Sequence, residues 1–331
     1  MKAPAIVVVT PALASANNGN WQTAQRWARW LARHYRVRLT DRWQGGGEAL
    51  MIALHARRSA PSVAAWGQAH PQRPLLLVLT GTDLYRDIDT DADAQRSLAL
   101  ADRLVVLNEC GPQQLAPALR AKATVMLQSS TARKPRVKSS RLLRALMVGH
   151  LREEKSPQTL FDAARRLAGR ADIRIDHIGA ALDPALGAQA EQLAAECPGY
   201  RWLGALPHAA TRARIQAAHL LVHSSRMEGG AHVVIEAVTS GTPVLASRID
   251  GNVGLLGLDY GGYFDCGDAS ALAALLERAR DDAAMLTALR AQCALRAPLF
   301  APERERQTLL ALVTTLLPSA DAALETLKDM P

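Results

Sequence analysis

The 331-residue sequence has few cysteines, and they are widely spaced. No two of the four stand in a Cys-x-x-Cys pair: Cys110, Cys197, Cys266 and Cys293. A structural zinc site or a disulfide framework needs cysteines at closer or more regular spacing. The sequence therefore indicates neither, and it fits a protein of the reducing cytoplasm.

Long hydrophobic runs are also missing. A membrane-spanning helix needs about 18 or more apolar residues, whereas the longest apolar stretches, such as PLLLVLTG, have the length of a strand. The N-terminal stretch KAPAIVVVTPALASA imitates a secretory signal peptide with an Ala-x-Ala site, and this alternative stays open. Its apolar part is short and β-branched and stops at Thr10 and Pro11, which favours a buried first strand. We expect a soluble protein without a membrane partner.

The net charge of +8 does not come from a long basic run. The 39 Lys and Arg residues are spread along the chain, and the one dense basic segment, ARKPRVKSSR at 132–141, is typical of a solvated linker. Nucleic-acid binding usually gathers such charge on one helix or face, so we expect no nucleic-acid partner. A basic surface does attract small phosphorylated anions.

Short apolar strands alternate with alanine-rich segments of helical period through most of the chain. This pattern is typical of a parallel sheet covered by helices. Residues 128–141 interrupt it with Ser, Lys, Arg and Pro. We predict two Rossmann-like α/β domains, residues 1–135 and 136–331, and the last helices can pack back on the first domain. Such sheets bind ligands at the carboxyl ends of their strands, so two facing domains are expected to form a ligand cleft.

The predicted strands are short, and the chain after about residue 270 is predicted to be helical. The strands are expected at residues 5–10, 35–40, 48–54, 74–80 and 102–108 in the first domain, and at 143–149, 172–179, 200–204, 219–224 and 242–247 in the second.

Two glutamates stand eight positions apart in SRMEGGAHVVIEAVTSGTPVLAS, residues 225–247. The pattern predicts a strand, a loop that contains Glu228, and a helix with Glu236 about two turns from its start. Eight helical positions span on the order of 12 Å, which is comparable to the distance from a nucleotide's ribose to a sugar beyond its diphosphate. A glutamate on a helix usually faces solvent, but Glu236 lies between VVI and AV and needs a partner if it is buried. We therefore expect one carboxylate at each end of a nucleotide sugar.

The residues between the two glutamates have properties that favour binding of the diphosphate of a nucleotide sugar. Gly229 and Gly230 allow the backbone to approach a ligand closely. The amides from Gly230 through Ala231 to His232 would lie at the start of the helix, where they can bind an anion.

A second strand, loop and helix is expected in LRALMVGHLREEKSPQTLFDAARRL. Ser156 is the predicted N-cap and Pro157 the first helical residue. Lys155 would lie beside this helix start, where positive charge gathers around a diphosphate, although a surface lysine is the alternative. The same loop supplies two more donor-binding candidates, Gly149 and His150. We expect Arg152 of this loop, together with Lys155 and Glu228, to be catalytic.

The first predicted strand is followed by an amide-rich loop. Asn18, Gly19 and Asn20 precede a helix that contains several tryptophans, so their polar groups are candidates for binding an acceptor. A helix cap and turn is an equally good interpretation.

The fourth predicted strand ends in LVLTGTDLYRDI. Its small loop, with Thr82, Asp83 and nearby Arg86, suits a compact or phosphate-bearing acceptor. Helix capping is the competing explanation for Thr82 and Asp83.

The glutamate pair resembles the E-x7-E motif of retaining GT-B glycosyltransferases of the glycosyltransferase 4 type, and VGHLREEKSPQTLFDAA is similar to their strand, phosphate loop and helix. The resemblance covers the C-terminal domain, including GTPVLASRIDGN. It implies that Glu236 holds the ribose, that Glu228 meets the donor sugar, and that Lys155 and an arginine bind the diphosphate. His150 stands where the family usually has arginine, so either Arg152 substitutes or the contact is weaker. The resemblance implies no divalent metal ion and no other cofactor.

Together with TPALASANNGNWQTAQRWARWL and LTGTDLYRDI, the glutamate motif resembles the selenosugar synthases of selenoneine biosynthesis, a group of GT-B enzymes. This resemblance spans nearly the whole chain. It implies a UDP-sugar donor, UDP-N-acetylglucosamine foremost, and selenophosphate as the nucleophile. A carbon–selenium bond would form at the anomeric carbon, and UDP would leave.

Three alternatives stay open, as does the oligomeric state. A hexosyltransferase acting on a glycan, lipid or small molecule would use the same donor residues. A hydrolysing UDP-N-acetylglucosamine epimerase would convert the donor without an acceptor. A non-catalytic sugar-nucleotide sensor would bind the donor without turnover.

Overall fold

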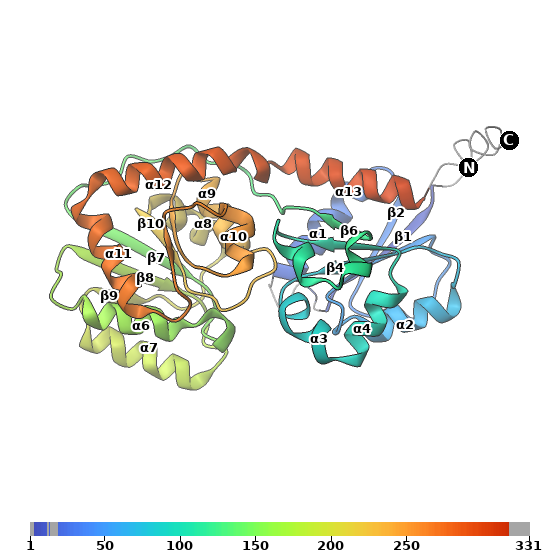
Figure 1. Ribbon diagram of the computed structural model, residues 1–331, viewed down its shortest axis with the longest axis horizontal. Helices are drawn as coiled ribbons and strands as arrows, with labels where there is room; N and C mark the ends of the chain where they lie inside the picture. The colour runs from blue at the N-terminus through green and yellow to red at the C-terminus, as the bar shows by residue number, and fades with distance from the viewer. Residues whose placement is uncertain (1–2, 12, 14–18, 318–331) are drawn as a thin grey trace. The chain divides into compact units, whose positions relative to one another are not determined.

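The structure is a computed structural model that describes residues 3–11, 13 and 19–317 (Figure 1). The chain divides into two compact units: unit 1 comprises Met1–Gln128 and Pro302–Pro331, and unit 2 comprises Ser129–Ala301. Within the described residues each unit contains a six-stranded parallel sheet with helices on both faces. The predicted pair of Rossmann-like α/β folds is therefore confirmed.

The sheet of unit 1 has the strand order β2-β1-β3-β4-β5-β6. Its strands are β1 (Ala5–Val9), β2 (Arg36–Thr40), β3 (Leu50–Leu54), β4 (Leu75–Leu79), β5 (Arg103–Val106) and β6 (Ala123–Val125). Its helices are α1 (Gly19–Leu31), α2 (Ala60–Ala69), α3 (Ile88–Thr90), α4 (Ala92–Leu100), α5 (Pro117–Arg120) and α13 (Pro302–Leu316), with a π-helical turn η2 (Asp83–Asp87) and a 3₁₀ turn η3 (Gly111–Gln114). The five predicted strands are present, whereas the short edge strand β6 was not predicted.

Unit 1 has a hydrophobic core on each face of its sheet. Its central strands are continuous apolar runs because both faces are covered, and β3 and β4 are buried along their whole length. One core contains Trp66 of α2 and Leu98 of α4. The other contains Trp27 of α1 together with Leu309 and Val313 of α13. The helix α13, which begins at residue 302, thus completes the unit formed by the first 128 residues.

Helix α13 packs against α1 (Figure 1). A buried polar contact fixes it there. Glu305 is 1% exposed and accepts two hydrogen bonds from Arg26, of 3.1 and 2.8 Å, and one of 2.7 Å from the Trp27 indole N–H. Residues from 302 onward therefore group with unit 1. The predicted C-terminal domain included them, with the allowance that the last helices can pack back on the first domain.

Replacing Glu305 by alanine is expected to lower the free energy of unfolding by about 3 kcal/mol, because it leaves the Arg26 guanidinium and the buried Trp27 N–H without their acceptor. Urea titration measures the effect. Glu303→Ala is the matched control, since Glu303 is exposed and, among the described residues, pairs only with Arg306 and Gln307 on its own helix. Its cost should stay below about 0.5 kcal/mol. Equal costs for the two variants would contradict the assigned role.

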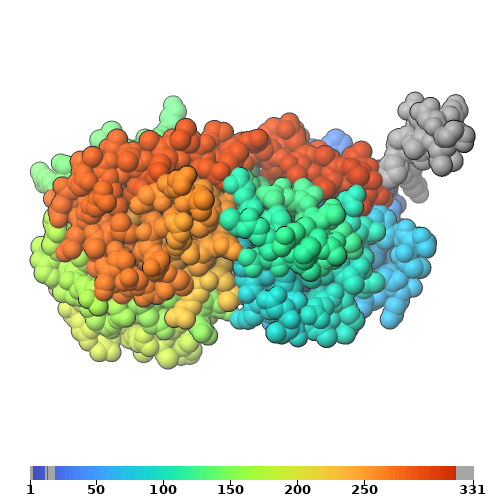
Figure 2. All heavy atoms as spheres, viewed as in Figure 1, coloured from blue at the N-terminus to red at the C-terminus, as the bar shows by residue number. Residues whose placement is uncertain are grey.

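The sheet of unit 2 has the strand order β12-β11-β10-β7-β8-β9. Its strands are β7 (Leu143–Val148), β8 (Ile173–Ile178), β9 (Tyr200–Trp202), β10 (Leu220–His223), β11 (Val244–Ser247) and β12 (Tyr263–Phe264). Its helices are α6 (Pro157–Arg166), α7 (Pro184–Glu196), α8 (His208–Ala217), α9 (His232–Val238), α10 (Asp250–Leu256), α11 (Ala269–Asp281) and α12 (Ala283–Arg296), with 3₁₀ turns η4 (Glu153–Lys155) and η5 (Ala297–Phe300). In the space-filling view, residues of α10 to α12, coloured orange, form a continuous surface on the visible side of this unit (Figure 2). Strand β12 was not predicted.

The boundary between the units lies between Gln128 and Ser129 rather than at the predicted residue 135. The segment after it is hydrogen-bonded along unit 2. Arg212 donates to the Thr131 carbonyl at 2.8 Å, the Arg133 amide donates to the Thr239 carbonyl at 2.9 Å, and Gln216 donates to the Lys134 carbonyl at 2.8 Å. Lack of periodicity in the sequence made this segment look like a free linker.

Among the described residues, no helix combines the length and the apolar composition that a membrane span requires. Within the same residues, no group of three or more His, Cys, Asp and Glu side chains is arranged to hold a metal ion.

Candidate functional site

Unit 2 places two loops at the switch point of its sheet. Strands β7 and β10 are neighbours in the sheet. Strands β8 and β9 follow on the side of β7, and β11 and β12 follow on the side of β10. In open parallel sheets, ligands bind beside the carboxyl ends of the strands at such a point. The loops after β7 and β10 carry Lys155 and Glu228, which the sequence analysis named as catalytic candidates.

The loop after β7 is held by close backbone packing. A Cβ at Gly179 would lie 1.9 Å from the Gly149 carbonyl oxygen, so glycine is required there. That oxygen accepts a hydrogen bond from Nε2 of His177 at 3.1 Å, and the Tyr200 hydroxyl donates to Nδ1 of the same ring at 3.1 Å. Buried side chains of β8 and β9 thus fix the start of the loop.

The end of this loop has a strained turn. Ser156 is buried and has φ 45°, and with His55 it is one of the two non-glycine residues with positive φ within the described chain. The Ser224 hydroxyl contacts the carbonyl oxygens of Lys155 and Ser156 at 3.0 and 3.1 Å. Ser156 occupies the predicted N-cap position of α6, but its hydroxyl contacts Thr159 Oγ1 instead of capping an amide. Such backbone conformations are concentrated at functional sites, and this one directly follows Lys155.

Lys155 and Glu228 form a direct ion pair. Lys155 Nζ lies 2.5 Å from Glu228 Oε1, and His223 Nε2 lies 3.4 Å from the same oxygen. Burial alone would raise the pKa of the Glu228 carboxyl, but the Lys155 charge and the His223 contact hold it well below its usual range. The Glu228 carboxylate is therefore ionised, and both side chains are only slightly exposed. A Cβ at Gly251 would lie 2.0 Å from the Glu228 carbonyl oxygen. Glycine at this position therefore allows the start of α10 to pack closely against the loop that carries Glu228.

The other candidates of the β7 loop lie around this pair. Arg152 is 42% exposed, and its Nε lies 3.9 Å from Glu154 Oε2. His150 accepts the Ala180 amide at 3.0 Å through Nδ1. Burial and the nearby charges of Arg152 and Lys155 lower the pKa of His150, so its imidazole is neutral at pH 7. The residue at the expected arginine position therefore adds no positive charge.

Glu236 is 4% exposed and is surrounded by two histidines and an arginine. Its Oε1 lies 2.6 Å from His208 Nε2, 3.5 Å from His232 Nδ1 and 3.8 Å from Arg212 Nη1. Burial raises the pKa of Glu236, but the His208 and His232 hydrogen bonds outweigh it and lower the value to about 2. All these contacts use Oε1, and none uses Oε2. This cluster is the partner that the sequence analysis required for a glutamate in so apolar a helix.

The helix that carries Glu236 is shorter than predicted. Helix α9 begins at His232, so Glu236 is its fifth residue, little more than one turn from the start rather than two. Gly229, Gly230 and Ala231 connect Glu228 to the helix, and Ala231 is buried. The His232 ring spans from Glu236 to the Ser129 carbonyl, which its Nε2 contacts at 3.1 Å.

The pKa of His177 predicts a pH dependence of stability. Burial lowers this pKa to about 4, whereas the unfolded value is about 6.5. The unfolded chain therefore binds the proton more tightly, and the free energy of unfolding should fall as the pH drops through this window, by about 2 kcal/mol between pH 7 and 5. His177→Gln should remove that loss in urea titrations at both pH values, while the exposed control His34→Gln should keep it. An unchanged pH dependence in His177→Gln would contradict the assignment.

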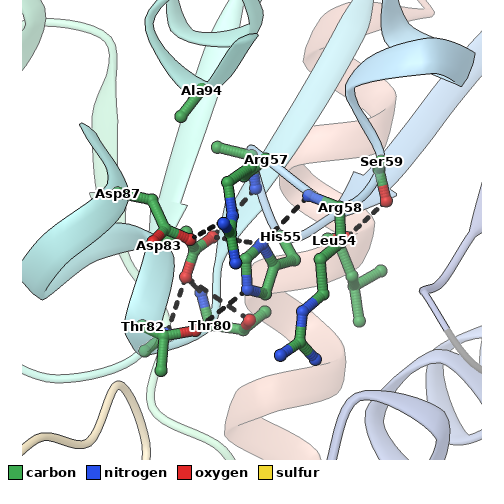
Figure 3. A network of polar contacts seen from close by, with 12 residues as sticks. Leu54, His55, Arg57, Arg58, Ser59, Thr80, Thr82, Asp83, Asp87 and Ala94 are labelled. Carbon is green, nitrogen blue, oxygen red and sulfur yellow. Dashed lines mark hydrogen bonds and ion pairs between the residues drawn. The ribbon is translucent and has the colours of Figure 1, made fainter. Parts of the chain in front are cut away.

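Unit 1 has its own switch point, between β1 and β3. His55 directly follows β3; it has φ 74° and is 2% exposed (Figure 3). The Arg58 amide donates to its Nδ1 at 3.3 Å, so Nε2 carries the proton that is donated to Thr82 Oγ1 at 3.0 Å. Burial lowers the pKa of His55 despite the opposing charge of Asp83. A neutral imidazole therefore orients the half-buried Thr82 hydroxyl.

Asp83 is completely buried and joins two loops (Figure 3). Its Oδ2 accepts the Ala56 amide at 2.9 Å, and its Oδ1 accepts the amides of Thr80 and Gly81 at 2.9 and 2.8 Å. The carboxylate thus ties the loop after β3 to the loop after β4 and positions Thr82.

Arginines gather beside this network. Arg57 Nε lies 2.9 Å from Asp87 Oδ2, and Arg86 Nε donates to Asp87 Oδ1 at 3.2 Å. Their side chains are 40% and 48% exposed, and Arg58 is exposed as well. The sequence analysis named Arg86 but missed His55, Arg57 and Arg58, although HARR directly after a buried strand was the available signal.

The remaining acceptor candidates lie at the start of α1. Gly19 is the exposed first residue of that helix, and its carbonyl accepts a hydrogen bond from the Thr23 hydroxyl at 2.9 Å. Asn20 is half-buried. Asn18 lies outside the described residues.

Several solved structures share this fold. Sucrose-phosphate synthase from Thermosynechococcus elongatus is 17% identical with a TM-score of 0.77, and the match covers 96% of this chain and 100% of that one. HepE from Anabaena in complex with UDP and glucose is 15% identical with a TM-score of 0.74, covering 94% and 99%. A point mutant of TarM from S. aureus in complex with fondaparinux, alpha-GlcNAc-glycerol and UDP is 13% identical with a TM-score of 0.65, covering 82% of this chain and 55% of TarM, so this chain spans about half the length of that protein. These likenesses establish the GT-B fold.

The second half of the chain matches a protein family by sequence. No curated protein sequence matches, but residues 128–297 match the family model described as glycosyl transferases group 1. The match extends over half of the chain and includes the β7 loop, Lys155, both glutamates and helix α9. The chain therefore belongs to the glycosyl transferases group 1 family.

Proposed function

We propose that this protein transfers the sugar of a UDP-sugar, with UDP-N-acetylglucosamine as the expected donor, to selenophosphate and releases UDP. The observation that carries the transferase part is the Lys155–Glu228 ion pair at the switch point of unit 2. The HepE and TarM structures that share the fold hold UDP, which supports a UDP-sugar as the donor. The acceptor rests on the sequence resemblance and on the cationic residues of unit 1.

The donor is proposed to bind through the oxygens that the protein leaves available. Oε1 of Glu236 is engaged by His208, and the second oxygen can accept the ribose hydroxyls. Glu228 is engaged by Lys155 in the same way and can offer Oε2 to a hydroxyl of the sugar. Anchoring one oxygen fixes the direction of the other, which favours a preorganised site.

The diphosphate is proposed to bind at Lys155. An ammonium group has three N–H donors, so Lys155 can keep Glu228 as one partner and still donate to phosphate oxygens. Arg152 and the amides from Gly230 to His232 add further donors. When the C1–O bond breaks, UDP leaves with the electron pair, and stabilising that developing charge is the largest contribution expected from the protein.

The nucleophile needs an anion site rather than a base. The selenium of selenophosphate already carries negative charge and forms the C1–Se bond directly, so no proton has to be removed. The neutral His55 fits this requirement because it donates to Thr82 and leaves the Thr82 hydroxyl hydrogen for a phosphate oxygen. Arg86 supplies positive charge, and Gly19 and Asn20 at the start of α1 can add polar groups.

Replacing His55 by asparagine is expected to raise the acceptor KM about five- to tenfold, because Thr82 loses the hydrogen bond that orients it. Asparagine tolerates the positive φ of this position. Steady-state kinetics with both substrates varied would measure it, and the donor KM should not change. In a Thr82→Val background the same change should add little, since each variant removes the same hydrogen bond between His55 and Thr82. Full additivity of the two effects would contradict the role of His55 in orienting Thr82.

The function is tested by UDP release from UDP-N-acetylglucosamine with and without freshly prepared selenophosphate. Release that depends on selenophosphate supports the proposal. Release at the same rate without it would favour hydrolysis or epimerisation. Release with a glycan acceptor alone would favour an ordinary hexosyltransferase, and binding without release would favour a sensor.

A further inference from the structure

A cavity of about 510 Å³ lies within unit 2 on the outer side of its sheet. Its charged lining consists of Arg144 on β7, Arg174 and Asp176 on β8, Arg201 on β9 and Arg214 on α8, and the rest is leucine and alanine. Four guanidinium groups thus face one carboxylate. These residues lie near the amino ends of the strands, at the opposite edge from the loops of Lys155 and Glu228.

Two of the arginines are direct neighbours. Arg144 and Arg174 are register partners on the adjacent parallel strands β7 and β8, which places their backbones about 4.8 Å apart. Like charges at neighbouring positions of a sheet repel each other and destabilise it. An anion between the two guanidinium groups would remove the repulsion.

The single carboxylate of the cavity is already used. Asp176 Oδ1 lies 2.7 Å from Arg201, and its Oδ2 lies 3.4 Å from Arg214. Arg174 donates to the Pro198 carbonyl at 2.5 Å. Among the described residues, no carboxylate pairs with Arg144 or Arg174. These two charges are therefore not compensated by the protein.

This part of the sheet is open to solvent. Arg174 and Arg201 are exposed, while Ile173, Ile175 and Tyr200 are buried on the other face. On the cavity side α8 contacts β7, and the lining residues Ala217 and Ala218 lie at the end of that helix. A ligand can therefore reach the arginines without displacing a structural element.

We propose that this arginine cavity binds a small molecule with two or more phosphate groups. Guanidinium groups bind phosphate oxygens in pairs, and four of them suit several phosphates better than one. The volume falls in the range of pockets for small organic ligands, about 300–1,000 Å³. Inorganic polyphosphate and a nucleoside polyphosphate share this chemistry, and the apolar lining would favour the second. The site is separate from the proposed donor site and does not depend on it.

Chemical modification tests the site residue by residue. The protein is treated briefly with phenylglyoxal, which modifies accessible guanidinium groups, and the adducts are mapped by peptide mass spectrometry. Inorganic tripolyphosphate is expected to lower modification of Arg144 and Arg174 about tenfold relative to sodium chloride of equal ionic strength. The exposed Arg278 and Arg304 should be unaffected. Equal modification of all four arginines with and without tripolyphosphate would overturn the proposal.

Binding to variants provides a second measurement. In R144Q/R174Q the Kd for tripolyphosphate, measured by calorimetry, is expected to rise at least tenfold. The control R278Q/R304Q removes the same charge elsewhere and should change the Kd less than twofold; equal changes in both variants would overturn the proposal. R144Q/R174Q should also have a Tm no lower than wild type, which shows that lost binding is not lost folding. If ATP binds more tightly than tripolyphosphate to wild type alone, the ligand is a nucleoside polyphosphate; if not, it is the inorganic form.

Discussion

The Lys155→Met variant is expected to lose about 10²- to 10³-fold in kcat for UDP release, which is the usual effect of removing one donor that stabilises a developing negative charge. Methionine keeps an unbranched side chain that is one atom shorter, but it removes the ammonium group that lies 2.5 Å from Glu228. Two consequences combine: the leaving diphosphate loses its cation, and the buried Glu228 carboxylate loses the charge that holds its pKa low.

The control for Lys155 is Lys134→Met, because Lys134 is exposed and its side chain lies outside the proposed site. Its kcat should stay within twofold of wild type. Circular dichroism and the Tm of both variants show whether the fold is kept. If Lys155→Met retained wild-type kcat, the diphosphate would have to be stabilised elsewhere, and the proposed role of the β7 loop would be wrong.

The Glu236→Gln variant is expected to weaken UDP binding about 10- to 100-fold. Hydrogen bonds to a charged group contribute about 1.5–3 kcal/mol, and about 1.4 kcal/mol corresponds to tenfold in Kd. The pKa of Glu236 is about 2, so wild type presents a carboxylate to the ligand throughout the neutral pH range. Calorimetry with UDP measures the change.

A pair of ligands identifies the group that Glu236 contacts. Wild type should prefer UDP over 2′,3′-dideoxy-UDP by about the same factor that the substitution costs, whereas Glu236→Gln should bind both ligands about equally. This comparison separates a lost contact from a general disturbance of the histidine and arginine cluster, which would weaken both ligands alike. A variant that kept the wild-type preference for UDP would show that another residue binds the ribose hydroxyls.

Much of the fold follows from local sequence patterns. The buried strands of both sheets are continuous apolar runs between turn signals, so their positions could be predicted. The edge strands β6 and β12 are three and two residues long and carry no such run. That the last helices can pack back on the first domain was expected, but the contact that fixes α13 could not be predicted, because Glu305 and Arg26 stand 279 positions apart.

The proposed donor residues were easier to recognise than the acceptor residues. Lys155, Glu228 and Glu236 stand in segments with strong local signals, a helix start and an apolar helix that contains one carboxylate. His55 has no such signal, since its importance comes from a positive φ and a hydrogen bond to Thr82, 27 positions away. Asp83 was predicted to bind the acceptor or cap a helix, but it accepts three amides from two loops, an arrangement visible only in the folded chain.

The mass spectrum of the sugar product tests the proposed function most directly. Protein, UDP-N-acetylglucosamine and selenophosphate are incubated together, and UDP and the sugar product are quantified in the same sample. The proposal predicts one UDP released for each N-acetylhexosamine product that shows the isotope pattern of selenium, with neither formed at that rate when selenophosphate is left out. UDP release accompanied only by selenium-free sugar would contradict it.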